Sequence, residues 1–167
     1  MRPDSGSASS KLFNTAFETG VRSVVILDAI YPSSLNLDRL VALDHLVVHT
    51  ADVNGPPSLH PAAPTRAAEM LVRRALVDRG LLMMIGRGLI ARLATPSGIM
   101  FSAGEEAGFF VSLLRSQYAR ELKLRADWLA QNIATLDEEP FGLVVHAQLE
   151  RWAIQFQPTQ TVTEGGE

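Results

Sequence analysis

Three of the four histidines in this 167-residue chain fall in one stretch, DHLVVHTADVNGPPSLHP, residues 44–61. His45 and His49 stand four residues apart, one helical turn, so both rings can lie on one face of a helix. Asp52 and His60 follow within a short distance. Because imidazole and carboxylate groups are common zinc ligands, the spacing could build a metal site. A catalytic site and a structural loop rich in histidine are the alternatives.

The catalytic alternative lacks its usual template. In the metalloprotease pattern a glutamate directly follows the first histidine as general base, but here Leu46 holds that position and Asp44 precedes the histidine. Neither a phosphate-binding G-x-x-x-x-G-K-[ST] loop nor a G-x-S-x-G nucleophile motif occurs. We therefore predict no catalytic residues, no metal and no cofactor, and interpret the stretch as a structural loop with histidines hydrogen-bonded to backbone. A metal site remains the alternative, and it would use His45, His49, Asp52 or His60.

Composition is that of one globular domain, with 47% hydrophobic and 20% charged residues. Cysteine is absent, which excludes disulfides and thiolate metal sites. There is neither an apolar run of about 20 residues nor a secretory signal, so we expect a cytoplasmic protein with no membrane partner. The net charge is −3, but the segment 66–92 holds six arginines and two acids, a balance of +4, which leaves −7 for the remainder. This segment is either a face for an acidic partner or a solvated helix surface.

The elements around the histidines are predicted to be mostly helical. Thr15 and Glu18 have the spacing of a capping box, and an apolar stripe follows until Pro32 stops the helix. Asn36 is a plausible N-cap for a helix over 37–50. A long connection with four prolines occupies 51–65, a length typical of functional or tightly packed loops.

The middle of the chain predicts a helix to Gly80, a second short helix over 81–87, and a β-hairpin. The strands of the hairpin, 89–94 and 99–103, flank the turn residues TPSG. Further helices are predicted after Glu105, after Tyr118 and after Asp137. Two helices followed by a hairpin are the order of a winged helix, a variant of the helix-turn-helix. The predicted fold is therefore mainly α with a small β-hairpin, a winged-helix core flanked by N- and C-terminal helices. It occupies one domain over 11–156, between a flexible N-terminus, 1–10, and a flexible tail, 157–167.

The second helix of this winged helix is poorly suited to reading DNA. A recognition helix presents polar or basic side chains to base edges, whereas residues 81–85 read LLMMI. Five consecutive residues sweep round more than one full turn, so some of them face outward unless other helices cover them. Exposed methionines suit an adaptable protein contact. We therefore predict a partner-binding surface made by Met83, Met84, Arg87, Arg73 and Arg74. Arg73 and Arg74 point about 100° apart, so one of them can serve an internal carboxylate.

Three segments, LFNT, LDHLVVHT-D--GPPSLHP and LVRR-L---GLLMM--RGL, taken together and in this order, carry a family resemblance. Over residues 12–103 the chain resembles the middle component of bacterial three-component ABC-ATPase systems, which overlap with Lamassu-type defence systems. One departure is Ala16, where the family would place a proline in the first helical turn.

The resemblance implies a winged-helix adaptor subunit without catalysis of its own. It would bind an SMC/Rad50-like ABC ATPase near its head region and couple it to an effector, often a nuclease, against phage or plasmid DNA. Non-specific DNA contact through the complex is compatible with this role. A winged-helix DNA-binding transcriptional regulator is the alternative, and a metal-dependent enzyme built on the histidines is the third hypothesis.

Overall fold

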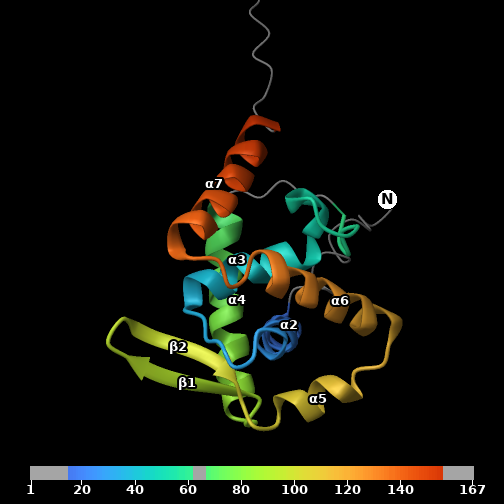
Figure 1. Cartoon of the computed structure of the whole chain (residues 1–167), viewed down its shortest axis with the longest axis vertical. Helices are drawn as coiled ribbons and strands as arrows, with labels where there is room; N and C mark the ends of the chain where they lie inside the picture. Colours follow the sequence, from blue (N-terminus) through green and yellow to red (C-terminus); the bar gives the residue numbers. More distant parts are fainter. Residues whose placement is uncertain (1–14, 62–66, 156–167) are drawn as a thin grey trace, which may run out of the picture.

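The computed structural model describes residues 15–61 and 67–155, which form a mainly helical fold with one β-hairpin (Figure 1). The elements of these ranges are, in chain order, α2 (Ala16–Ala29), α3 (Leu37–Val48), the short 3-10 helix η1 (Thr50–Val53), α4 (Ala67–Ile85), β1 (Ile90–Thr95), β2 (Gly98–Ala103), α5 (Ala107–Leu113), α6 (Gln117–Asn132) and α7 (Glu138–Gln155). The predicted flexible ends, 1–10 and 157–167, lie outside the described residues. In the part of the chain that is described, no helix is both long and apolar enough to cross a membrane.

The first two helices begin where their capping residues predict. Thr15 Oγ1 accepts a hydrogen bond from the Glu18 backbone N–H at 3.2 Å, and Glu18 Oε2 accepts one from the Thr15 N–H at 3.3 Å, so the capping box is confirmed. Asn36 Oδ1 accepts from the Arg39 N–H at 2.9 Å and opens α3. Both caps satisfy backbone donors that would otherwise lack partners inside the helix.

The prediction of a separate short helix over 81–87 is wrong, because α4 continues without a break through Gly80 to Ile85. Gly80 serves a close helix crossing instead of a helix end. A Cβ atom there would lie 2.6 Å from both the Ala16 carbonyl oxygen and the Gly20 nitrogen of α2. Only glycine permits this approach, and it is placed in the helix interior despite its poor helix propensity.

The hairpin is confirmed, with a register running from Ile90 opposite Ala103 to Thr95 opposite Gly98. Gly98 closes the turn at φ +121°, a conformation that favours glycine. The hairpin is tied to the body by Leu35, between α2 and α3, whose backbone exchanges two hydrogen bonds of 2.9 and 2.7 Å with that of Phe101 in β2.

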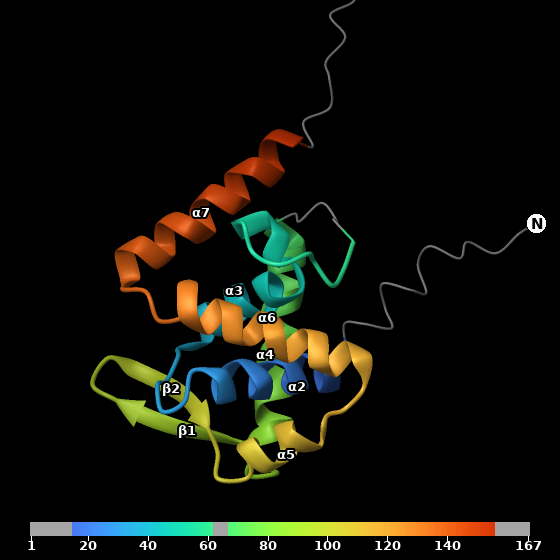
Figure 2. The same ribbon diagram turned by 45° about the vertical axis from the view of Figure 1, so that its right-hand side comes forward.

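The described helices share one hydrophobic core. Helix α2 runs across α4 and also packs against α6, and α3 packs against all three (Figure 2). The largest fully buried apolar side chains come from these four helices: Ile26, Leu27, Leu40, Leu43, Leu81, Met84 and Leu129. α2 is therefore the element on which α3, α4, α5, α6 and the hairpin converge.

The crossing of α2 and α4 gives a first testable prediction. Gly80→Ala should destabilise the protein by about 3 kcal/mol, because the added methyl group meets backbone atoms that cannot rotate away. Gly142→Ala in α7 is the matched control, since a Cβ there meets nothing within 4 Å. It should be neutral or stabilise by up to about 1 kcal/mol through helix propensity. Urea unfolding of both variants measures the difference, and equal midpoints would contradict the close crossing.

Candidate functional site

The most concentrated polar cluster in the described residues surrounds the carboxylate of Asp44, which is fully buried in α3. Arg22 of α2 donates to it twice, from Nε to Oδ1 at 2.6 Å and from Nη2 to Oδ2 at 3.1 Å. Arg73 of α4 donates from Nη1 to Oδ2. Arg22 Nη2 also reaches Thr19 Oγ1 at 3.3 Å. One carboxylate thus joins three helices.

Charge pairing holds the two arginines in place. Burial acts to lower the pKa of Arg22, but the charge and hydrogen bonds of Asp44 outweigh it, and the pKa is raised above its ordinary value. A bidentate arginine–carboxylate pair is among the stronger polar contacts in proteins. Removing one member of a buried ion pair leaves an uncompensated charge, which is more costly than never having had the pair.

The three histidines of the 44–61 stretch lie next to this ion-pair cluster. The rings of His45 and His49 have centroids 4.4 Å apart, and His60 meets His49 edge-on at 6.1 Å. Burial, reinforced by nearby positive charges, lowers the pKa of His45 to about 2 and the pKa values of His49 and His60 to about 4. All three rings are therefore neutral near pH 7.

The described part of the Pro-rich connection, residues 51–61, contacts α6 and α7. His60 Nε2 lies 2.9 Å from the hydroxyl of Tyr118, a side-chain partner where the sequence predicted backbone. Arg125 donates to the Pro57 carbonyl from Nε at 2.8 Å and from Nη2 at 2.6 Å. Gln148 Nε2 donates to the Asp52 carbonyl at 2.6 Å.

Metal binding by the histidines finds no support in the geometry. Among residues 15–61 and 67–155, no group of three or more histidine and acidic side chains is arranged to hold an ion. Asp52 lies in η1, where its carbonyl is used by α7, and Asp44 is occupied by two arginines. The arrangement can therefore fix helices relative to one another, and it supplies no set of metal ligands.

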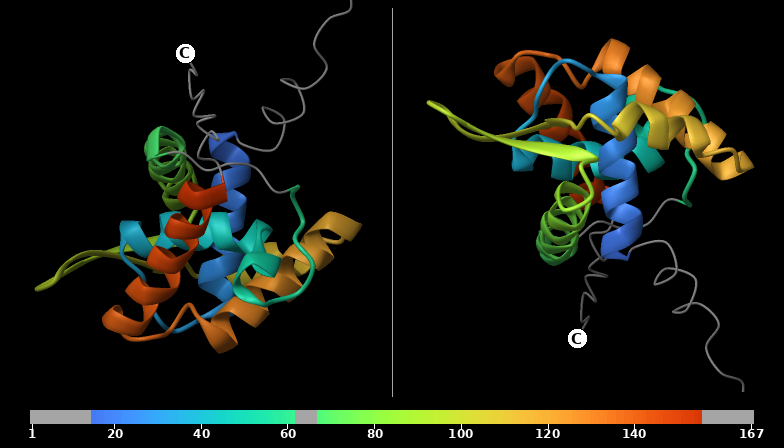
Figure 3. Two further views of the ribbon diagram at one scale, coloured as in Figure 1. Left: turned by 90° about the horizontal axis from the view of Figure 1, so that it is seen from above. Right: turned by 90° about the horizontal axis from the view of Figure 1, so that it is seen from below.

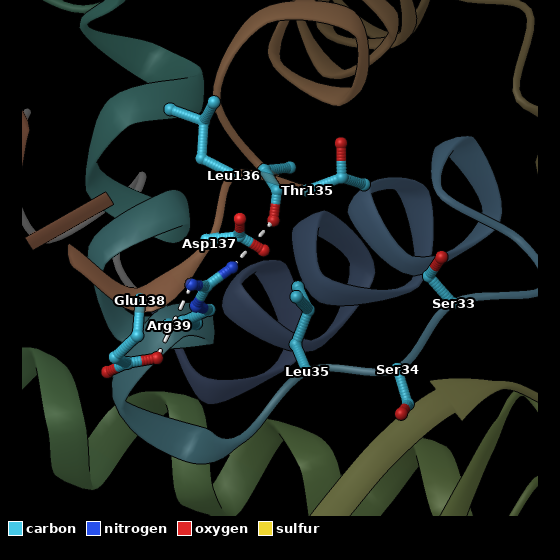
Figure 4. Close-up of a pocket in the computed structure, with 9 residues that line it drawn as sticks. Ser33, Ser34, Leu35, Arg39, Thr135, Leu136, Asp137 and Glu138 are labelled. Atoms are coloured by element: carbon cyan, nitrogen blue, oxygen red, sulfur yellow. Dashed lines mark hydrogen bonds and ion pairs between the residues drawn. The ribbon is translucent and has the colours of Figure 1, made fainter. Parts of the chain in front are cut away.

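A cavity of about 310 Å³ lies elsewhere, between the α2–α3 and α6–α7 connections (Figure 4). Arg39 is its charged lining residue from α3. Its Nη1 donates to the Ala134 carbonyl at 3.3 Å, and its Nη2 lies 3.4 Å from Glu138 Oε2. The guanidinium also lies 4.3 Å above the Phe141 ring. Because these contacts are internal, Arg39 serves to join α3 to α7.

The residues predicted to bind a partner separate into internal and exposed ones. Met84 is only 1% exposed and packs over Gly20 at the α2–α4 crossing, so the expectation that it lies on the surface is wrong. Arg73 serves the internal carboxylate of Asp44. Arg74 pairs with Asp38 at the surface, and Arg87, also exposed, donates to the Met83 carbonyl at 2.8 Å. Met83 itself is half-buried.

The apolar residues that do face solvent on α4 were not singled out by the sequence analysis. Leu71, Val72 and Leu82 are 70%, 62% and 63% exposed. Together with Ala75, which is also exposed, Leu71 and Leu82 follow an i, i+4, i+11 spacing that places them on one face. This spacing could have been recognised, but the apolar residues of the opposite, buried face overlap with it along the sequence.

Fold and site together define a mainly helical protein with a β-hairpin, in which the most concentrated polar cluster is internal and several helices, α4 among them, expose apolar side chains. The sequence over residues 12–155 matches the model of the family described as ABC-three component (ABC-3C) system Middle Component 2. The chain belongs to this family, and membership implies that it works with the other components of such a system. Neither the curated proteins nor the solved structures gave a match.

The ion-pair cluster gives a second prediction. Asp44→Asn should lower the free energy of unfolding by about 3–5 kcal/mol, because two arginines lose their charge partner inside the protein. Asp38→Asn is the matched control, since it also removes an α3 carboxylate paired with an arginine of α4 but at the surface. Its cost should stay below about 1 kcal/mol. Denaturant unfolding compares the two, and equal losses would contradict a special role for Asp44.

The histidines give a third prediction, a loss of stability at mildly acidic pH. Unfolded histidines titrate near pH 6.5, whereas His45 and His49 stay neutral in the fold to about pH 4 or below. Between these values unfolding takes up protons, so the free energy of unfolding falls as the pH falls, by about 1.4 kcal/mol per pH unit for each such histidine. His60, whose pKa is also lowered to about 4, adds a similar share.

Unfolding measured between pH 6.5 and 4.5 checks this slope. His49→Asn should remove about one histidine's share of it, whereas His146→Asn, on an exposed position of α7, should leave it unchanged. An unaltered slope in His49→Asn would show that the fold does not lower the pKa of His49.

Proposed function

We propose that this protein is the adaptor subunit of a bacterial defence complex and has no catalytic activity of its own. It binds an SMC/Rad50-like ABC ATPase and couples it to an effector of the nuclease type, in a Lamassu-type response to phage or plasmid DNA. The observation that carries the proposal is the family match over residues 12–155. A middle component needs surfaces for other proteins more than it needs a reaction centre.

The placement of charged and apolar groups supports a binding role. The buried histidines, Asp44, Arg22 and Arg73 are used to join helices of the same chain. Large apolar side chains remain exposed on α4 instead. Such exposure is characteristic of protein contact surfaces.

We further propose that α2, α3, α4 and the hairpin form a winged-helix unit in which α4 holds the position of the recognition helix. This assignment differs from the sequence prediction, which gave that place to residues 81–87. Its support is the order of elements and the bridge from Leu35 to Phe101, which attaches the segment between the first two helices to the hairpin as a third, minimal strand.

A DNA-binding regulator is the second candidate, favoured by the exposed Arg79 on α4, Arg87 just after it and Arg92 on β1. Three phosphate contacts would give a log–log salt slope of about −2.7. Affinity for duplex DNA would then fall roughly 40-fold between 50 and 200 mM salt. Contacts made mainly by apolar side chains are far less sensitive to salt.

The fourth prediction concerns assembly. When the chain is produced together with the ATPase and effector components of its own system, the three should co-elute as one complex, and the complex should persist at 200 mM salt. Light scattering on the eluted peak measures the assembly, and omission of this chain should separate the ATPase from the effector. An ATPase and effector that remain associated without it would overturn the adaptor role. A chain that elutes alone but retards DNA with the salt slope above would favour the regulator.

A further inference from the structure

Helix α7 rests on the molecule along a single narrow line. Between residues 138 and 148, only Phe141 and Gln148 are buried, and Val144 and Val145 are half-buried. These four positions are spaced i, i+3, i+4 and i+7, so they share one face of the helix. All other residues of this range are exposed, and no other helix of the described residues lies over α7 when the molecule is seen from above (Figure 3). The contact of α7 with the body is therefore one-sided over this range.

A polar contact lies at each end of this line. At the start of α7, Arg39 Cζ lies 4.3 Å from the centroid of the Phe141 ring, and Arg39 Nη2 lies 3.4 Å from Glu138 Oε2. Further along the helix, Gln148 Nε2 donates to the Asp52 carbonyl of η1 at 2.6 Å. The Glu138 side chain is 87% exposed, so solvent weakens its ion pair. Gln148 is itself buried, so its hydrogen bond is better shielded than the ion pair.

The core that holds the other helices together depends little on α7. The ion pairs of Asp44 join α2, α3 and α4, and the largest fully buried apolar side chains come from these helices and from α6. Within residues 138–148, Phe141 is the one apolar side chain that is buried. The described element that α7 contacts most is η1. The packing of α2, α3, α4 and α6 on one another is therefore largely independent of α7.

The connection between α6 and α7 has the character of a hinge. Ile133 and Ala134 are buried and fix the end of α6. Thr135, Leu136 and Asp137, which follow, line the cavity of about 310 Å³ (Figure 4). Hinges are formed by a few residues at the end of an element that change their backbone angles. This connection is anchored on the α6 side and borders open space before α7 begins.

The sequence of α7 makes it a weak helix without its contacts. Gly142 lies inside the helix, and a Cβ atom there would meet nothing within 4 Å. This glycine serves no close approach and only lowers the helix propensity. In proteins most of the stability of a helix comes from the packing of its apolar face. When α7 leaves α3 and η1, it should therefore lose its helical hydrogen bonds.

We propose that α7 is a strap that detaches from α3 and η1 while α2, α3, α4, α6 and the hairpin stay folded, with the connection 135–137 as its pivot. Detachment uncovers Phe141, Val144 and Val145, together with the side of η1 that α7 covers. Local opening of this kind has a lower free energy than global unfolding. It gives the molecule two arrangements of one surface, and a partner that binds only one of them selects it. The strap goes beyond the adaptor role and does not depend on it.

The fifth prediction tests the strap by native-state hydrogen exchange of the full chain, measured for each amide by NMR. After correction for intrinsic rates, the amides of residues 142–148 should exchange with one common rate, at least about 100-fold faster than those of residues 22–27 in α2. A common rate distinguishes detachment from fraying, which affects the helix end first. Low concentrations of urea should accelerate the α2 amides more strongly, because global unfolding exposes more surface than detachment does.

Two substitutions separate detachment from global unfolding. Ile26→Val weakens the core of α2, which the detached state keeps, so it should accelerate the α2 amides about 5-fold and leave those of 142–148 unchanged. Gln148→Ala removes the hydrogen bond to the Asp52 carbonyl and should accelerate the amides of 142–148 about 10-fold. Gln131→Ala, at an exposed glutamine of α6, is the matched control and should leave these rates unchanged. Circular dichroism should show all three variants folded.

Three results would overturn the strap. Equal rates for 142–148 and 22–27 would mean that α7 opens only with the whole fold, and so would an Ile26→Val effect of the same size on both sets. Rates of 142–148 that Gln148→Ala leaves unchanged would mean that η1 does not hold the helix. None of these results bears on assembly with the ATPase and the effector, so the adaptor role is tested separately.

Discussion

The fold depends on one buried carboxylate. Asp44 is reached by Arg22 from α2 and by Arg73 from α4, so a single side chain of α3 fixes three helices that are distant in sequence. Such a contact is directional in a way that leucine and valine packing is not, because the guanidinium must meet the carboxylate oxygens at hydrogen-bonding distance. A rotation of any of the three helices would leave a charge unpaired in the core, where no water can compensate it.

The second constraint is the close approach of α2 and α4 at Gly20 and Gly80, which brings the two backbones nearly into contact. Arg22 and Arg73 reach the same carboxylate from helices that the glycines hold together. The histidines then lie between this cluster and the Pro-rich connection as neutral rings, with His45 tilted against His49 and His60 edge-on to it. The spacing of the three histidines suggested metal binding or catalysis. Their buried environment instead makes them packing residues that stay uncharged.

Local signals were sufficient for much of the fold. The caps at Thr15 and Asn36 and the turn before Gly98 each depend on a few neighbouring residues, and each was predicted from the sequence. Gly80 was misread because a helix end and a close crossing both call for glycine, and only the position of α2 distinguishes them. Within the site, sequence reasoning foresaw that one of two adjacent arginines could serve an internal carboxylate, but not that the carboxylate is Asp44, since that pairing joins residues 29 positions apart.

The packing of α4 on the core also determines which of its residues are exposed. Residues 81–85 are apolar without interruption, so the sequence alone does not tell which of these side chains face the core and which face solvent. Once the core fixes the inner face through Leu81 and Met84, the helical period places Leu82 and, three turns earlier, Leu71 on the outside. Their exposure is thus a geometric consequence of how α4 is anchored. Because Leu71 and Leu82 are 70% and 63% exposed, replacing them by polar residues would cost the core of the chain little, whereas the same change at Leu81 or Met84 would bury a polar group in it.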